Sequence, residues 1–192
     1  ACDPAPPVDH YILALSWQPA FCERNAGRPE CRDLDRADFA ATNLSLHGLW
    51  PNGAGDDHPF YCGVAAADRN RDQDGDWCGL SATGADRATQ SDLAQLMPGS
   101  QSCLDRHEWI KHGTCTGLGG DAYFDAAMRL VLEVQTTQLS ERLRAAIGKT
   151  VSRRVLLEAF ERDFGGGAAA ALEITCRRNG GRAYLAEIRV AF

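Results

Sequence analysis

The chain has 192 residues, of which 44% are hydrophobic and 24% are charged, and its formal net charge is −6. This length and composition favour a single globular domain over residues 1–192, and the absence of an apolar run of roughly 20 residues argues against a membrane span. The acidic balance disfavours tight, salt-driven binding of a nucleic-acid backbone, but it does not exclude a nuclease with positive charge confined to its site.

The N-terminal half is predicted to contain two strands and a long loop. Residues 11–17 and 44–50 are short apolar runs that end at proline-containing turns, which is typical of buried strands. Residues 52–84 are rich in glycine, aspartate and asparagine and contain two cysteines. This segment is therefore predicted to be a long loop held by disulfides.

The C-terminal half is predicted to contain helices followed by a β-hairpin. Residues 171–177 and 183–190 alternate apolar and polar side chains around Asn179-Gly180-Gly181, which is typical of a hairpin. Strands and helices mix without a regular βαβ rhythm, so we expect an α+β fold with a central, mainly antiparallel sheet flanked by helices. The helices are predicted over residues 91–97, 104–112, 121–135, 140–148 and 152–164, the last three capped by Asp121, Ser140 and Ser152.

Eight cysteines are many for this length, and an even number suits pairing in an oxidising compartment. We therefore expect four disulfides. A zinc site of thiolates is the alternative, but no two cysteines have the C-x-x-C spacing. No signal peptide precedes Ala1, so we interpret the chain as the mature form of a periplasmic or secreted protein.

Three of the five histidines lie in two compact segments, LHGLWP with His47 and HEWIKHGTC with His107 and His112. On a helix His107 and Lys111 are four residues apart, as are Glu108 and His112, so the four polar side chains form two adjacent rows on one face. That face would offer an acid, two bases and a cation. The alternative is a solvated helix end whose basic residues lie near the C-terminal dipole.

Zinc and thiol chemistry are the main alternatives for this cluster. The segment begins like the H-E-x-x-H zinc motif, but its histidines are five residues apart, which leaves the rings roughly 140° apart around a helix. Zinc bound in this way is disfavoured, and we expect no metal and no other cofactor. A cysteine protease that uses Cys115 is possible in principle, but we expect the cysteines to be paired.

Two histidines near a lysine and a glutamate fit the cleavage of RNA. The substrate already carries its nucleophile, so a neutral histidine can take the 2′-OH proton while a protonated histidine donates to the departing 5′-oxygen. Because an ordinary histidine titrates at about pH 6.5, both forms coexist in mild acid, and we expect a bell-shaped pH profile. Trp50, Phe60 or Tyr61 could stack on a base, and core packing is the alternative for each of them.

At these residues the sequence resembles the ribonuclease T2 family, whose two active-site segments look like HGLWP at 47–51 and HEWIKHGTC at 107–115. Residues 13–22 look like the family's first strand and the loop after it, and residues 149–160 and the closing hairpin look most like the bacterial periplasmic ribonuclease I branch. The resemblance implies an α+β fold and a metal-independent endoribonuclease. Such an enzyme cleaves single-stranded RNA to a 2′,3′-cyclic phosphate and then, more slowly, to a 3′-phosphate.

The resemblance also implies a role for each polar residue. His47 would protonate the leaving 5′-oxygen and His112 would be the base toward the 2′-OH, although the sequence by itself leaves open which histidine is the acid. Glu108 and Lys111 would polarise the phosphate and stabilise the pentacovalent state. His107 would bind the phosphate.

For the base, the resemblance implies that Trp50 flanks the first nucleotide. Ser16 stands where relatives with a uridine preference carry glutamine, so we expect little base specificity. We expect RNA as the substrate, no membrane association and a monomer. A catalytically silent RNA-binding protein of the same fold is the second functional hypothesis, and the complete set of catalytic residues disfavours it.

The family resemblance supports Cys62–Cys115 most directly, with Cys22–Cys31 and Cys78–Cys103 beside it. In the family a cysteine of a C-terminal tail pairs with the position of Cys176. This chain stops at Phe192, so Cys2–Cys176 is predicted by elimination. The bond between Cys62 and Cys115 would tie the two histidine segments into one cleft.

Residues 68–76 alternate oxygen-bearing side chains, as calcium loops do. If Gly75 is the sixth residue of such a loop, the loop starts at Asn70, and its twelfth residue, Ser81, is not the expected glutamate. A polar surface loop is therefore favoured over a calcium site.

Overall fold

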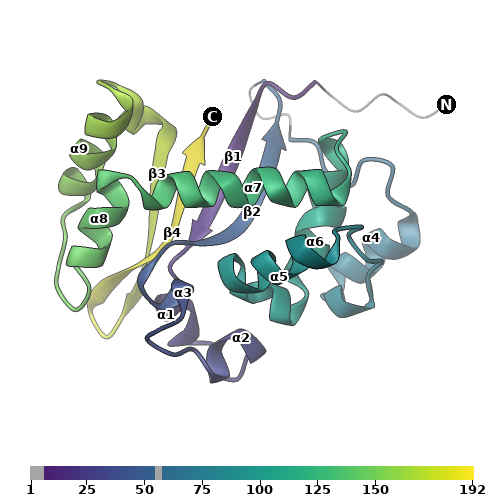
Figure 1. The fold of residues 1–192 in the computed structure, drawn as a ribbon, viewed down its shortest axis with the longest axis horizontal. Coiled ribbons are helices and arrows are strands. Elements are labelled where there is room, and N and C mark those ends of the chain that lie inside the picture. The colour runs from purple at the N-terminus through teal and green to yellow at the C-terminus, as the bar shows by residue number, and fades with distance from the viewer. Residues whose placement is uncertain (1–6, 55–57) are drawn as a thin grey trace.

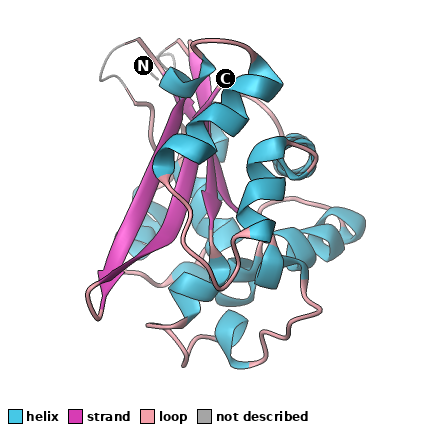
Figure 2. Cartoon of the chain, turned by 90° about the vertical axis from the view of Figure 1, so that its left-hand side faces the viewer, coloured by secondary structure: helices cyan, strands magenta, loops and turns pink. Residues whose placement is uncertain are grey.

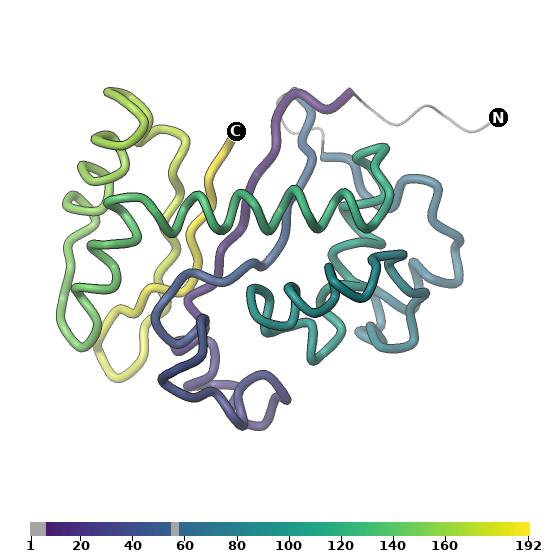
Figure 3. The backbone as a smooth tube through the Cα atoms, viewed as in Figure 1, coloured from purple at the N-terminus to yellow at the C-terminus, as the bar shows by residue number. Residues whose placement is uncertain are grey.

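A computed structural model describes residues 7–54 and 58–192, in which an antiparallel sheet has the strand order β2-β1-β4-β3 (Figure 1). The chain trace in Figure 3 shows β1 lying between β2, which belongs to the N-terminal half of the chain, and β4, which lies at its C-terminal end. The α+β class and the predicted strands are confirmed. The strands are β1 (His10–Ser16), β2 (Ser45–Asn52), β3 (Leu172–Asn179) and β4 (Arg182–Ala191).

Alternation along the strands separates a core face from an open face of the sheet. On β4, Ile188 and Val190 are buried in the core, whereas Glu187 and Arg189 point to the other face. The β3–β4 hairpin closes through Gly180 and Gly181, whose φ angles of 54° and 78° suit the turn that best matches the twist of two strands. The open face carries the polar residues discussed below.

The longest helix, α7 (Gly120–Gln135), crosses the core face of the sheet in Figure 1. It buries Tyr123, Phe124 and Val131 within the main hydrophobic core. Other helices lie on either side of it in the same view: α8 (Gln138–Ala145) and α9 (Arg153–Phe164) beside the hairpin, and α5 (Arg87–Leu96) and α6 (Leu104–Lys111) toward β2. No helix in the described ranges is both long and apolar enough to cross a bilayer.

The prediction of a long loop over residues 52–84 is wrong, because α4 (Ala66–Gln73) and a 3-10 turn (Trp77–Gly79) lie within it. Asp72 is the only buried residue of α4, so the sequence has no apolar periodicity that would reveal a helix. The segment that looked like a calcium loop or a polar surface loop is thus helical as far as Gln73. The short helices α1 (Gln18–Cys22), α2 (Pro29–Arg32) and α3 (Phe39–Thr42) were also not predicted.

Two predicted helix caps are wrong and one is confirmed. Thr137, not Ser140, caps α8, since its hydroxyl accepts from the Ser140 amide at 3.3 Å. Asp121 lies inside the first turn of α7 and accepts from the amide of Asp86, the residue that caps α5. Ser152 caps α9 as expected.

Three disulfides join cysteines of the described ranges, and they are the pairs that the family resemblance implies. They join Cys22 to Cys31, Cys62 to Cys115 and Cys78 to Cys103. Cys176 is exposed and bonds to no other described cysteine. Its predicted partner Cys2 lies outside the described residues, so Cys2–Cys176 stays a prediction.

Candidate active site

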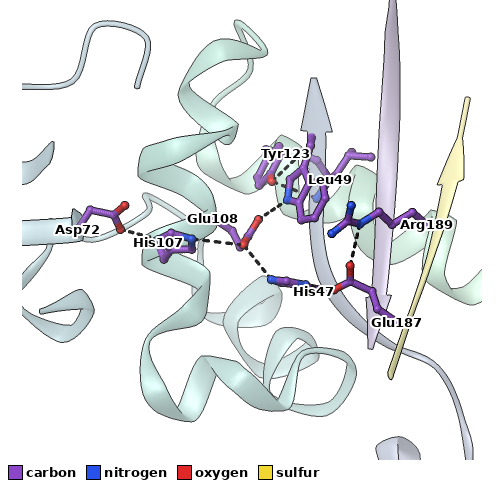
Figure 4. A network of polar contacts seen from close by, with 9 residues as sticks. His47, Leu49, Asp72, His107, Glu108, Tyr123, Glu187 and Arg189 are labelled. Atoms are coloured by element: carbon purple, nitrogen blue, oxygen red, sulfur yellow. Dashed lines mark hydrogen bonds and ion pairs between the residues drawn. The ribbon is translucent and has the colours of Figure 1, made fainter. Parts of the chain in front are cut away.

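The polar residues of the two histidine segments meet where β2 lies beside α6 (Figure 4). His47 comes from β2, and His107 and Glu108 come from α6. His112 follows the last residue of α6, and the disulfide between Cys62 and Cys115 links the next turn to the segment after β2. The arrangement brings together side chains that lie about sixty residues apart in the sequence.

A bulge in β2 aims His47 at this site. Ala14 pairs with Gly48 and the next residue, Leu15, pairs with Leu46, so His47 is the extra residue between them. Its Nδ1 lies 2.7 Å from Glu187 Oε2, and its Nε2 lies 3.4 Å from Glu108 Oε1. The imidazole is thus held between two carboxylates, one from β4 and one from α6.

This environment favours the protonated form of His47. Burial by itself lowers the pKa, but the hydrogen bond to Glu187 and the negative charges of Glu108 and Glu187 outweigh it. The pKa of His47 is therefore raised above its ordinary value of 6.5. A histidine in this state is suited to donate a proton in mild acid.

Glu108 is fully buried at the centre of the site. Its Oε2 accepts from Trp50 Nε1 at 2.7 Å, and its Oε1 lies 3.8 Å from His107 Nε2. Burial raises the pKa of Glu108, and the neighbouring positive charges of His47 and His107 only partly oppose the rise. Gly48 leaves room for this carboxylate, since a Cβ at that position would overlap Glu108 Oε2.

The strand beside Glu108 is fixed from the core side. Tyr123 of α7 donates its phenolic hydrogen to the carbonyl oxygen of Leu49 at 2.9 Å (Figure 4). Because Leu49 lies between Gly48 and Trp50, this bond holds the backbone of the HGLWP segment in place.

His112 has the opposite electrostatic environment to His47. Its ring stacks on Trp50 at 5.3 Å and meets the edge of Phe60 at 5.3 Å between ring centroids. Burial, followed by the nearby positive charges of Lys111, His107 and His47, lowers the pKa of His112 to about 2. The imidazole is therefore neutral over the physiological range, which is the protonation state that a general base requires.

His107 is held by a buried carboxylate of the unexpected helix α4. Its Nδ1 lies 2.6 Å from Asp72 Oδ1, and its ring stacks on Trp77 at 4.5 Å. The Tyr61 hydroxyl donates to the other oxygen of Asp72 at 2.8 Å, and burial followed by this bond raises the pKa of Tyr61 to about 12. The Asp72 contact leaves Nε2 of His107 facing Glu108.

The aromatic candidates for base binding separate into two places. Trp50 and Phe60 both contact His112, and Phe60 is 47% exposed. The ammonium group of Lys111 lies 5.5 Å from the centroid of the Phe60 ring. Tyr61 lies instead beside Asp72, with Arg69 over its ring.

Four residues of the site were not found from the sequence, namely Glu187, Arg189, Asp72 and Trp77. Arg189 donates to Glu187 Oε1 at 2.7 Å (Figure 4), and its guanidinium lies 5.0 Å from the centroid of the Trp50 ring. The alternation of the hairpin placed Glu187 and Arg189 on one face, but it did not say which strand lies beside them. The aspartate-rich segment 68–76 suggested a calcium loop, and nothing in the sequence indicated that its Asp72 contacts His107.

The chain is similar to known ribonucleases. The model of the ribonuclease T2 family matches residues 8–192. Ribonuclease I of Escherichia coli is 36% identical over 201 residues, which cover 95% of this chain and 74% of that protein. A ribonuclease of Aeromonas hydrophila is 34% identical over 124 residues, which cover 64% of this chain and 44% of that protein. The crystal structure of Actibind, a T2 ribonuclease, covers all of this chain and 78% of its own at a TM-score of 0.53 and 16% identity, which shows a shared fold.

Proposed function

The chain belongs to the ribonuclease T2 family and is an RNA-cleaving enzyme, and from that premise we propose that it works by transesterification with His47 as acid and His112 as base. The observation that carries this assignment is electrostatic. The pKa of His47 is raised and that of His112 is lowered, so the two imidazoles hold opposite protonation states in mild acid. Paired groups whose pKa values are pushed apart are typical of acid–base catalysis.

In the first step neutral His112 takes the proton of the ribose 2′-OH, and the 2′-oxygen attacks the adjacent phosphorus. Protonated His47 donates its proton to the 5′-oxygen as the P–O5′ bond breaks, which leaves a 2′,3′-cyclic phosphate and a free 5′-OH. In the slower second step His47 takes a proton from water, the water oxygen attacks phosphorus, and His112 returns a proton to the 2′-oxygen. The product then carries a 3′-phosphate.

The remaining polar residues act on the charge that develops at phosphorus. Lys111 supplies a positive charge, and His107, held by Asp72, turns its other ring nitrogen toward the space beside Glu108. Burial raises the pKa of Glu108, so we propose that its protonated form donates a hydrogen bond to a phosphate oxygen, whereas its ionised form helps to raise the pKa of His47. Trp50 and Phe60 would stack on the base without reading its edge, which fits little base specificity.

A comparison of RNA with DNA in EDTA tests the proposed function. RNA should be cut at an unchanged rate after chelation, the early products should end in a 2′,3′-cyclic phosphate, and DNA should stay intact because it lacks the 2′-OH. The ends can be identified by mass spectrometry. Loss of RNA cleavage in EDTA would point to a zinc hydrolase, and cleavage of DNA would contradict attack by the 2′-oxygen.

The Glu187→Gln variant should shift one limb of the pH profile. Protonated His47 is required for the first step, so kcat/KM falls as pH rises through the pKa of His47. The negative charge of Glu187 helps to raise that pKa, so its removal should move the alkaline limb to lower pH. Glu187 is not among the charges that lower the pKa of His112, so the acid side of the profile should stay in place.

Glu173→Gln is the matched control for this variant. Glu173 lies on the same face of the sheet and pairs with Arg189 at 3.6 Å, but none of its atoms contacts His47. Its profile should overlay that of the wild type. An unshifted alkaline limb in Glu187→Gln, measured from pH 4 to 9, would show that Glu187 does not set the titration of the acid.

We further propose a periplasmic or secreted location and a monomeric, single-domain enzyme over residues 1–192. Three disulfides favour an oxidising compartment. The proposed catalytic residues all come from one chain, so the mechanism needs no second subunit.

A further inference from the structure

The β3–β4 hairpin, which we call the ribbon, carries three exposed arginines close to its turn, Arg177, Arg178 and Arg182. None of them has a carboxylate oxygen within 4.0 Å among the described residues. Figure 2 shows the turn of this ribbon at the lower left, clear of the helices. A protein of net charge −6 thus presents a local positive patch on a projecting hairpin.

The strand register places part of this patch on the face that holds the active site. Thr175 pairs with Glu187, the residue that contacts His47, so Thr175 lies on the open face. The irregularity at this point leaves the extra residue on β4, and β3 continues with regular alternation. Arg177, two residues beyond Thr175, therefore returns to the open face.

The open-face residues of β3 and their partners on β4 form two successive cross-strand pairs, which we call the stripe. Arg177 pairs with Tyr184, and Asn179 pairs with Arg182. From a rise of about 3.3 Å per residue, the two pairs lie about 7 Å and about 13 Å beyond Glu187. Arg178 alternates to the opposite face, opposite Ala183.

The stripe lies on a definite side of the scissile bond. Both β2 and β4 run antiparallel to β1, so they run parallel to each other. The direction along β2 from Trp50 to His47 is therefore the same as the direction along β4 that leads to the β3–β4 turn. If Trp50 flanks the base before the scissile phosphate, the nucleotide whose 5′-oxygen His47 protonates lies on the ribbon side.

We propose that the open face of the ribbon binds single-stranded RNA on the 3′ side of the scissile phosphate, through Arg177, Tyr184 and Arg182. This inference rests on the proposed function, because it uses His47 as the acid. The guanidinium groups pair with successive phosphates, and the Tyr184 ring offers a surface on which a base stacks. The two pairs lie about 7 Å apart because same-face residues of a strand repeat at this interval, so each pair can contact a different nucleotide.

Substrates of different length test the proposal. A dinucleoside monophosphate reaches only the catalytic residues, and the same dinucleotide can be extended by a short run of nucleotides on its 3′ side or on its 5′ side. For the double variant Arg177→Ala/Arg182→Ala, the ratio of kcat/KM on the 3′-extended substrate to that on the dinucleotide should fall about tenfold at low salt. The salt dependence of log(kcat/KM) should flatten by about 0.7 for each arginine–phosphate pair that the variant removes.

Arg178→Ala is the matched control, because it removes an arginine from the same ribbon but from the other face. Its substrate ratio should equal that of the wild type, and Tyr184→Ala should lower the ratio in the same direction as the double variant. Equal losses for Arg177→Ala and Arg178→Ala, or a loss confined to the 5′-extended substrate, would overturn the proposal. Failure of the wild type to cleave the dinucleotide would instead count against the proposed function.

Discussion

The variants His47→Ala and His112→Ala should each have a kcat about 10²–10⁴-fold below that of the wild type, which is the range that general acid–base catalysis supplies. The two losses have different causes. His47→Ala removes the proton that the leaving 5′-oxygen requires, whereas His112→Ala removes the group that ionises the 2′-OH. Steady-state kinetics on a dinucleoside monophosphate measures both effects without the contribution of distant RNA contacts.

His107→Ala is the matched control for these variants, since it removes an imidazole from the same site. Asp72 holds His107 through Nδ1, so we expect His107 to present Nε2 to the phosphate rather than to transfer a proton. This variant should mainly raise KM, with a smaller change in kcat. A comparable fall in kcat for all three histidines would contradict the division between proton transfer and phosphate binding.

Glu108→Ala should lower kcat by about 10²–10³-fold, the cost of removing one preorganised donor to a developing anion. The carboxylate lies between His47 and His107 and accepts a hydrogen bond from the Trp50 indole. Its loss therefore also removes the contact at Nε2 of His47. Glu108→Gln keeps the shape and one hydrogen-bond donor. It should therefore retain more activity than Glu108→Ala.

Because Glu108 is buried, both variants also need a measurement of stability. Thermal unfolding will show whether the chain is folded at the assay temperature, and Glu133→Gln on the exposed face of α7 is the control for the chemical change itself. We expect a loss of kcat in variants that remain folded. Wild-type kcat in a folded Glu108→Ala protein would remove Glu108 from the mechanism.

The helical spacing explains why much of the site could be predicted from the sequence. Residues four apart share a face of α6, so His107 and Glu108 were expected to lie in one cluster with Lys111 and His112. The structure places His112 just after the end of α6 rather than within it. The hairpin and the first two strands were equally visible, because the alternation and the turn residues are local signals.

The contacts that tune the site were not predictable because they are long-range. His47 and Glu187 are 140 residues apart in the sequence. They meet because β4 pairs with β1, the strand that also pairs with β2. The register within that pairing decides that Glu187, and not a neighbour, reaches the bulge of β2. No local pattern specifies either choice.

Helix α4 shows a second reason for failure. Its buried side is a single aspartate that bonds to His107 and Tyr61, so the helix is held by polar tertiary contacts instead of an apolar stripe. A rule based on hydrophobic periodicity cannot detect such a helix. The same polarity made the segment look like a calcium loop.

The most direct test of the central claim, that His47 is the acid and His112 the base, uses a dinucleotide in which sulfur replaces the bridging 5′-oxygen. A thiolate leaves without a proton, because thiols are far stronger acids than alcohols, so the substrate no longer needs the acid. On this substrate His47→Ala should recover a rate close to that of the wild type, whereas His112→Ala should stay impaired. Recovery of His112→Ala instead, or equal impairment of the two variants, would contradict the assignment.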